Sequence, residues 1–241
     1  MIKKKYIHLF FDLDNTLWDF ENNSCGAMQQ TFIHFNLHER DVDFNRFFDI
    51  YTYNNRQLWN EYRNGNRIKK ELTRLRFELT LSKFGIKDLC PDEMNAFYLA
   101  EMPGQKRLVS GTVELLDYLK GKGYLLYILT NGFREVQHKK LEITGLKKYF
   151  TRVFISEDIK APKPAREIFE YAIKSANAKK KDSLMIGDDP EVDVAGALNA
   201  GIDAVWFNTN VKEGGLEEKF PARNGHFVYT IHSLSQLEQI V

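Results

Sequence analysis

The sequence has few cysteines and no excess of charge, and each of these absences excludes a class of protein. Its 241 residues include only two cysteines, Cys25 and Cys90, which lie far apart and make no metal-binding pair. We expect both to be free thiols in a reducing cytoplasm. Lysine and arginine total 34 against 33 acidic residues, so the formal net charge is +1. This balance gives no electrostatic reason to bind a nucleic-acid polymer or an anionic membrane.

Long apolar runs are also missing. No stretch approaches the roughly 20 apolar residues that a membrane-spanning helix needs. The basic residues 3–5 are followed by an apolar run that ends at Asp12 after about six residues, whereas a signal peptide needs roughly 7–15. We therefore expect a cytoplasmic protein with no membrane partner.

The pattern of apolar residues separates a helical block from an α/β part. Residues 18–103 carry four helical segments and no convincing strand pattern. Elsewhere, short apolar strands alternate with helices, which is typical of a parallel sheet covered on both faces. The predicted strands are 6–11, 124–129, 153–155, 183–186 and 204–207, and the predicted core helices are 112–120, 134–144, 165–175 and 190–200.

These segments predict an α/β fold with a doubly wound, Rossmann-like parallel sheet. The core domain would consist of residues 1–17 and 104–241, because the first strand most simply joins the same sheet as the later ones. Residues 18–103 would form an α-helical cap domain inserted between the two parts of the core.

Polar residues collect where the predicted strands end. Open α/β sheets bind ligands outside the carboxyl ends of their strands, so residues at these positions are expected to meet at one edge. Four segments supply them: Asp12, Asp14 and Thr16; Thr130, Asn131 and Gly132; Lys163; and Asp188 and Asp193. A turn, a solvated lysine or a helix cap would explain each segment alone, but not the coincidence of all four.

The residue types predict phosphoryl transfer assisted by a metal. An oxygen-only set of carboxylates suits Mg²⁺ better than zinc, and we expect the metal ligands to be Asp12, Asp14, Asp188 and Asp193. One aspartate can attack phosphorus and form an acyl phosphate, while a second handles protons. We expect the catalytic residues to be Asp12, Asp14 and Lys163. Hydroxyl, amide and ammonium groups can bind the phosphoryl oxygens, which assigns substrate binding to Thr16, Thr130, Asn131, Gly132 and Lys163.

These motifs, in this order, resemble the haloacid dehalogenase superfamily. The resemblance covers residues 6–17 and about 105–210, and the helical block is similar to that superfamily's four-helix cap. It implies that Asp12 is the nucleophile and that Asp14 is the general acid/base, which also binds the metal through its backbone carbonyl.

The same resemblance implies roles for the later motifs. Thr130 and Lys163 correspond to the second and third motifs, and Asp188 to the direct metal ligand of the fourth. Asp193 would support the site through water or through the lysine. Asp189 stands where serine or asparagine is common in relatives, so its role stays open.

Asp14 separates the two main branches of the superfamily. The dehalogenase branch keeps the nucleophile, needs no metal and lacks the second aspartate, so Asp14 favours a phosphatase. The sequence segments 129–133, 141–146 and 201–208 are similar to those of pyrimidine 5′-nucleotidases that clear noncanonical nucleotides. This similarity implies a nucleoside 5′-monophosphate as substrate. A sugar-phosphate phosphatase, a phosphoglucomutase-like enzyme, a metal-free 2-haloacid dehalogenase and a non-enzymatic binding module are the alternatives.

Overall fold

The computed structural model describes residues 6–209, 217–222 and 225–241, which fall into two compact units. One unit combines the chain up to Phe20 with the chain from Arg107 onward, and the other spans Glu21–Lys106. The sequence predicts domain boundaries at 17/18 and 103/104, which lie a few residues before the boundaries of these two units. The predicted boundaries stay a prediction. The basic residues 3–5 lie outside the described residues.

The first unit is built on one seven-stranded sheet with the order β3-β2-β1-β4-β5-β7-β6. Its strands are β1 (His8–Phe11), β2 (Leu125–Thr130), β3 (Arg152–Ile155), β4 (Ser183–Gly187), β5 (Asp203–Phe207), β6 (Glu217–Ala222) and β7 (His226–Ile231). All neighbouring pairs are parallel except β6 and β7. The strand that precedes the helical insertion thus lies inside the sheet, between β2 and β4.

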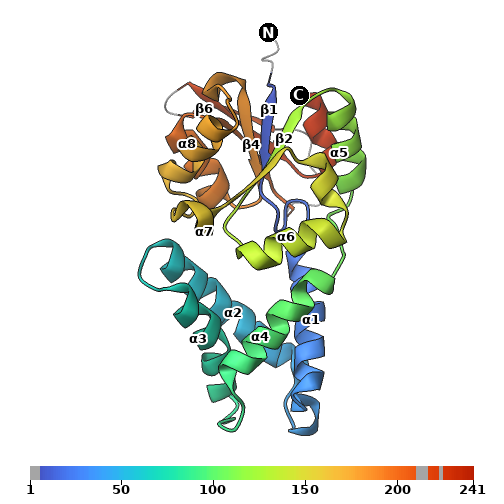
Figure 1. The fold of residues 1–241 in the computed structure, drawn as a ribbon, viewed down its shortest axis with the longest axis vertical. Helices are drawn as coiled ribbons and strands as arrows, with labels where there is room; N and C mark the ends of the chain where they lie inside the picture. The colour runs from blue at the N-terminus through green and yellow to red at the C-terminus, as the bar shows by residue number, and fades with distance from the viewer. Residues whose placement is uncertain (1–5, 210–216, 223–224) are drawn as a thin grey trace. The chain divides into compact units, whose positions relative to one another are not determined.

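Helices cover both faces of this sheet. They are α5 (Thr112–Gly121), α6 (Arg134–Ile143), α7 (Ser156–Ile159), α8 (Arg166–Ser175) and α9 (Gly196–Ala200), with a π-helical turn at Pro190–Ala195 and shorter 3-10 turns at Leu146–Tyr149, Lys180–Asp182 and Leu234–Gln239. Figure 1 shows α8 and α5 on opposite sides of the strands. The predicted doubly wound α/β fold with a helical insertion is confirmed.

Alternation along β1 explains why both faces are covered. Successive side chains of a strand point to opposite faces of the sheet, so the apolar run of β1 supplies both layers. Phe10 belongs to a buried cluster with Ile168 and Phe169 of α8 and Ala197 of α9, and its ring stacks on Tyr127 with centroids 4.8 Å apart.

The second unit is helical. It contains most of α1 (Phe20–His34), together with α2 (Phe44–Arg63), α3 (Lys69–Ser82) and α4 (Pro91–Glu101), and short 3-10 turns at Leu37–Glu39 and Met102–Gly104. Local signals set several limits: the Asp43 carboxylate accepts a hydrogen bond from the backbone of Arg46, and Pro91 occupies the first turn of α4. The interior is aromatic, with Phe47, Phe77 and Tyr98 all buried.

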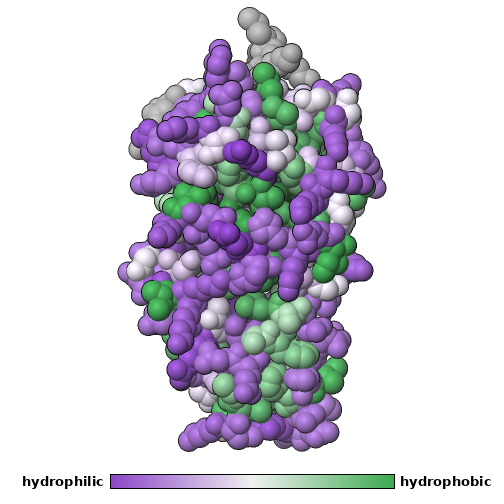
Figure 2. Space-filling model, in the orientation of Figure 1, coloured by the Kyte–Doolittle hydropathy of each residue, from purple (hydrophilic) through white to green (hydrophobic). Residues whose placement is uncertain are grey.

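Surface composition agrees with the balanced charge of the sequence. Hydrophilic residues cover most of the face seen in Figure 2, and apolar residues there form small groups. Among the described helices, none has both the length and the apolar character required to cross a bilayer.

Two leucines in the sheet test the importance of its centre. Leu184 of β4 is fully buried, whereas Leu125 at the start of β2 is 40% exposed. We predict that Leu184→Ala lowers the free energy of unfolding by about 2–5 kcal/mol, because it removes buried methyl groups and leaves a cavity. Leu125→Ala should cost less than about 1 kcal/mol in the same urea titration. Equal losses in the two variants would contradict the central position of β4.

Candidate active site

A buried ammonium group, that of Lys163, lies at the carboxyl edge of the sheet. Its Nζ is 2.6 Å from Asp12 Oδ1 and 2.6 Å from Asp193 Oδ1. Asp12 directly follows β1, and Asp193 lies on the π-helical turn after β4. Lys163 is only 1% exposed, so little water screens these contacts. Three segments that are distant in sequence therefore share one charged centre.

Asn131 holds the backbone of Lys163 in place. Its side-chain oxygen accepts a hydrogen bond from Lys163 N at 2.8 Å, and its Nδ2 donates to Lys163 O at 2.9 Å. Both ends of this amide are therefore used to position the lysine. The contact with substrate expected for Asn131 stays a prediction.

The end of β4 is shaped to admit Asp193. A Cβ atom on Gly187 would collide with the Asp193 carboxylate, so only glycine leaves room for it. Asp193 Oδ2 also accepts a hydrogen bond from Asp189 N at 3.2 Å. The π-helical turn replaces the start of the α-helix predicted at 190–200, and such turns are frequent at functional sites.

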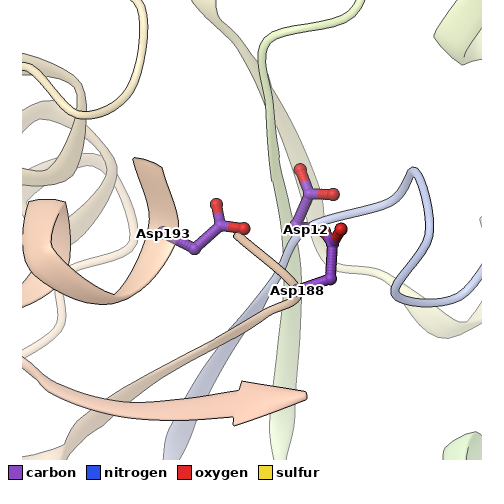
Figure 3. A group of neighbouring side chains, drawn as sticks. All are labelled: Asp12, Asp188 and Asp193. Atoms are coloured by element: carbon purple, nitrogen blue, oxygen red, sulfur yellow. The ribbon is translucent and has the colours of Figure 1, made fainter. Parts of the chain in front are cut away.

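Three carboxylates gather around this ammonium. Oxygen atoms of Asp12, Asp188 and Asp193 lie within 4.8 Å of one another. Figure 3 shows Asp12 beside Asp188, with Asp193 extending towards them from the helical turn. Three carboxylates against one ammonium leave two negative charges. A divalent cation would neutralise them, and an all-oxygen donor set suits Mg²⁺.

The electrostatics of the group show the same deficit of positive charge. Burial and neighbouring carboxylates raise the pKa of Asp12 and of Asp193, against the opposing effect of Lys163. Burial, followed by the charge of Asp193, raises the pKa of Asp188 to about 7. Burial alone would lower the pKa of Lys163, but Asp12 and Asp193 outweigh it, so that pKa is raised. A cation bound at this site would favour the ionised carboxylates.

The Asp14 side chain makes its hydrogen bonds to residues outside this group of carboxylates. Its Oδ1 is 2.6 Å from Lys140 Nζ, and its Oδ2 accepts a hydrogen bond from Gln137 Nε2 at 2.8 Å. Asp14 therefore does not join the group of three carboxylates through its side chain. The expected contribution to a metal site through its backbone carbonyl stays a prediction.

Gln137 and Lys140 were absent from the candidates predicted from the sequence. Both lie on the buried face of α6, where Lys140 also packs over the ring of Trp18 with its Nζ 3.9 Å from the ring centroid. Burial lowers the pKa of Lys140, while the Asp14 carboxylate opposes this effect. Polar residues among Val136 and Leu141 on an otherwise apolar helix face were the signal available in the sequence.

The two threonines point towards different groups. Thr130 Oγ1 accepts hydrogen bonds from Gly132 N at 3.1 Å and from Gln137 Nε2 at 2.8 Å. A hydroxyl has two acceptor sites and one donor, so its proton remains available for another oxygen. Thr16 Oγ1 donates a long hydrogen bond of 3.4 Å to Asp188 Oδ1.

Asp189 has a structural partner of its own. Its side chain accepts hydrogen bonds from the backbone nitrogens of Glu191 at 2.9 Å and Val192 at 3.0 Å. It therefore caps the π-helical turn.

The chain as a whole is similar to several known proteins. Residues 8–201 match the model of the haloacid dehalogenase-like hydrolase family. The chain is 32% identical over 238 residues to the pyrimidine 5′-nucleotidase YjjG of Escherichia coli, covering 98% of each chain. It is 36% identical over 233 residues to the pyrimidine 5′-nucleotidase PynA of Streptococcus pneumoniae, covering 95% of this chain and 93% of the relative.

A solved structure shares the fold over nearly the whole chain. It is that of a HAD-hydrolase, YfnB, from Bacillus subtilis, which was crystallised with magnesium. The two chains superpose with a TM-score of 0.85 at 27% identity, covering 98% of this chain and 99% of the other.

Asp188 and its neighbour Asp189 provide a matched test of the carboxylate group. We predict that Asp188→Asn weakens Mg²⁺ binding by at least about tenfold in isothermal titration calorimetry, because it removes one of the two uncompensated charges. Asp189→Asn should change the affinity less than about threefold, because asparagine also caps helices. Similar losses in both variants would show that general negative charge, not this group, attracts the cation.

Proposed function

Because the chain belongs to the haloacid dehalogenase-like hydrolases, we propose that it removes phosphate from nucleoside 5′-monophosphates through a phosphorylated Asp12, with Mg²⁺ as its metal. Its relatives support the class of phosphoric monoester hydrolase, and those with the printed names of pyrimidine 5′-nucleotidases support a pyrimidine nucleotide as substrate. The single observation that best supports the proposed chemistry is the ion pair between Lys163 and Asp12, inside a group of three carboxylates.

The first half of the proposed reaction transfers the phosphoryl group to Asp12. Lys163 occupies Asp12 Oδ1, which leaves Oδ2 to attack phosphorus. The bond from phosphorus to the nucleoside oxygen breaks, and protonated Asp14 gives its proton to the departing alkoxide. The free proton of the Thr130 hydroxyl suits a hydrogen bond to a phosphoryl oxygen.

The second half releases phosphate. A water molecule attacks phosphorus, its proton passes to ionised Asp14, and the electron pair of the broken bond returns to Asp12. Asp14 is thereby protonated again and ready for another turnover. Lys163 balances charge on Asp12 in both halves.

The carboxylate group fits the metal that this chemistry needs. Asp12 and Asp188 would hold Mg²⁺, and Asp193 would support the site by orienting Lys163. When bound, the cation supplies neutralisation of the phosphate oxygens, which lets an anionic nucleophile approach an anionic substrate. A metal-free dehalogenase has no need of such a group.

Replacing the nucleophile tests the mechanism. We predict that Asp12→Asn lowers kcat for p-nitrophenyl phosphate by at least roughly 10³-fold, since the amide cannot form the acyl phosphate. Circular dichroism should remain that of the unmodified chain. The Asp189→Asn variant serves as the control and should keep most of the activity. Undiminished hydrolysis by the Asp12→Asn protein would contradict the proposed mechanism.

A substrate panel tests the specificity. With Mg²⁺ present, we expect kcat/KM for pyrimidine nucleoside 5′-monophosphates to exceed that for purine nucleotides and sugar phosphates by at least about tenfold, a difference of 1.4 kcal/mol. Excess EDTA should abolish turnover, and added Mg²⁺ should restore it. A preference for sugar phosphates would replace the nucleotidase proposal, and halide release from 2-haloacids in EDTA would replace the phosphatase mechanism.

A further inference from the structure

We propose that Lys140 and Gln137 are positioning residues for Asp14, and that they hold its carboxyl group where it can take a proton from an attacking water molecule. The proposal rests on the proposed function, because it concerns the acid/base residue of that reaction. It assigns a task to two side chains of α6 that the mechanism above does not otherwise use.

Both oxygens of Asp14 are engaged by groups that donate hydrogen bonds. Lys140 Nζ lies 2.6 Å from Oδ1, and Gln137 Nε2 lies 2.8 Å from Oδ2. An ammonium has donors only, and the amide presents its donor end here. Each oxygen of Asp14 is therefore held in place by its own donor.

The surroundings of Lys140 direct its charge towards Asp14. Its side chain is 2% exposed, and its Nζ lies 3.9 Å from the centroid of the fully buried Trp18 ring and 5.6 Å from that of Phe20. Aromatic faces attract a cation and exclude water, so the ion pair is weakly screened. The Asp14 side chain is 25% exposed, which leaves it open to an approaching water molecule.

Gln137 connects Asp14 with the second motif. Its Nε2 donates to Thr130 Oγ1 at 2.8 Å as well as to Asp14, while its buried Oε1 has no partner among the described residues. Turning the amide over would place Oε1 against the carboxylate and lose both bonds. The Asp14 side chain therefore fixes the amide, and the amide in turn leaves the Thr130 proton free for another oxygen.

This arrangement matters most in the second half of the proposed reaction. There, water forms a bond to phosphorus, the bond from phosphorus to Asp12 breaks, and the water proton moves to Asp14. A carboxylate that is held in place and open to water speeds that transfer. The first half with p-nitrophenyl phosphate needs no proton from Asp14, because p-nitrophenolate leaves as an anion.

The two half-reactions can be separated by stopped-flow kinetics of the Mg²⁺-loaded enzyme with p-nitrophenyl phosphate. In Lys140→Met, which keeps the length of the side chain but not its charge, we expect hydrolysis of the phosphoenzyme and kcat to fall about 10²-fold. The rate of p-nitrophenolate release in the first turnover should change less than threefold. A burst close to one product per active site should therefore appear, with phosphorylated protein recovered after acid quench.

Matched variants complete the experiment. Lys139→Met changes the adjacent exposed lysine of α6 and should behave like the unmodified enzyme, while Lys140→Arg should recover part of the lost rate. Gln137→Met removes the other donor and should also slow phosphoenzyme hydrolysis selectively; it carries the same test if Lys140→Met fails to fold. Unchanged kinetics, or equal slowing of both halves, would overturn the proposal. Failure of the unmodified enzyme to form any phosphoenzyme would instead overturn the proposed function.

Discussion

The balance of charge around the buried ammonium of Lys163 is the constraint on which the candidate site depends. A buried carboxylate without a partner is costly, and Asp12 and Asp193 each lie 2.6 Å from this one cation. The contact joins the end of β1 to two later segments of the chain, so the position of Asp12 depends on the whole sheet. The backbone bonds from Asn131 and the absence of a side chain at Gly187 serve the same contact.

A second buried lysine divides the acids into two sets. Lys140 pairs with Asp14, while Lys163 serves the group of three carboxylates. The two aspartates of the first motif are only two residues apart, yet they have different cationic partners. Strand β1 ends at Phe11, so both aspartates lie beyond it and the alternation along the strand does not set the directions of their side chains. The remaining negative charge of the first set is what a divalent cation would offset.

The sequence predicted the core strands β1 to β5 to within about two residues, because their near-continuous apolar runs are typical of buried parallel strands. It did not predict β6 and β7, although His226–Ile231 is rich in β-branched and aromatic residues. The end of the predicted helix at 190–200 was right, but its first part is a π-helical turn. That turn brings Asp193 to Lys163, and no local propensity encodes such a long-range contact.

The fold class, the family resemblance and the candidate residues followed from the amino-acid sequence, because strand ends and motif residues are local features of the chain. The pairing of these residues depended on the tertiary structure. It assigned Asn131 to the backbone of Lys163, Asp189 to a helix cap, and Lys140 and Gln137 to Asp14. These pairings depend on distances between segments that are more than a hundred residues apart in the case of Asp14, and periodicity along the chain carries no information about them. A buried charge pairs with a polar or oppositely charged group that lies close to it, and the tertiary structure determines which groups are close.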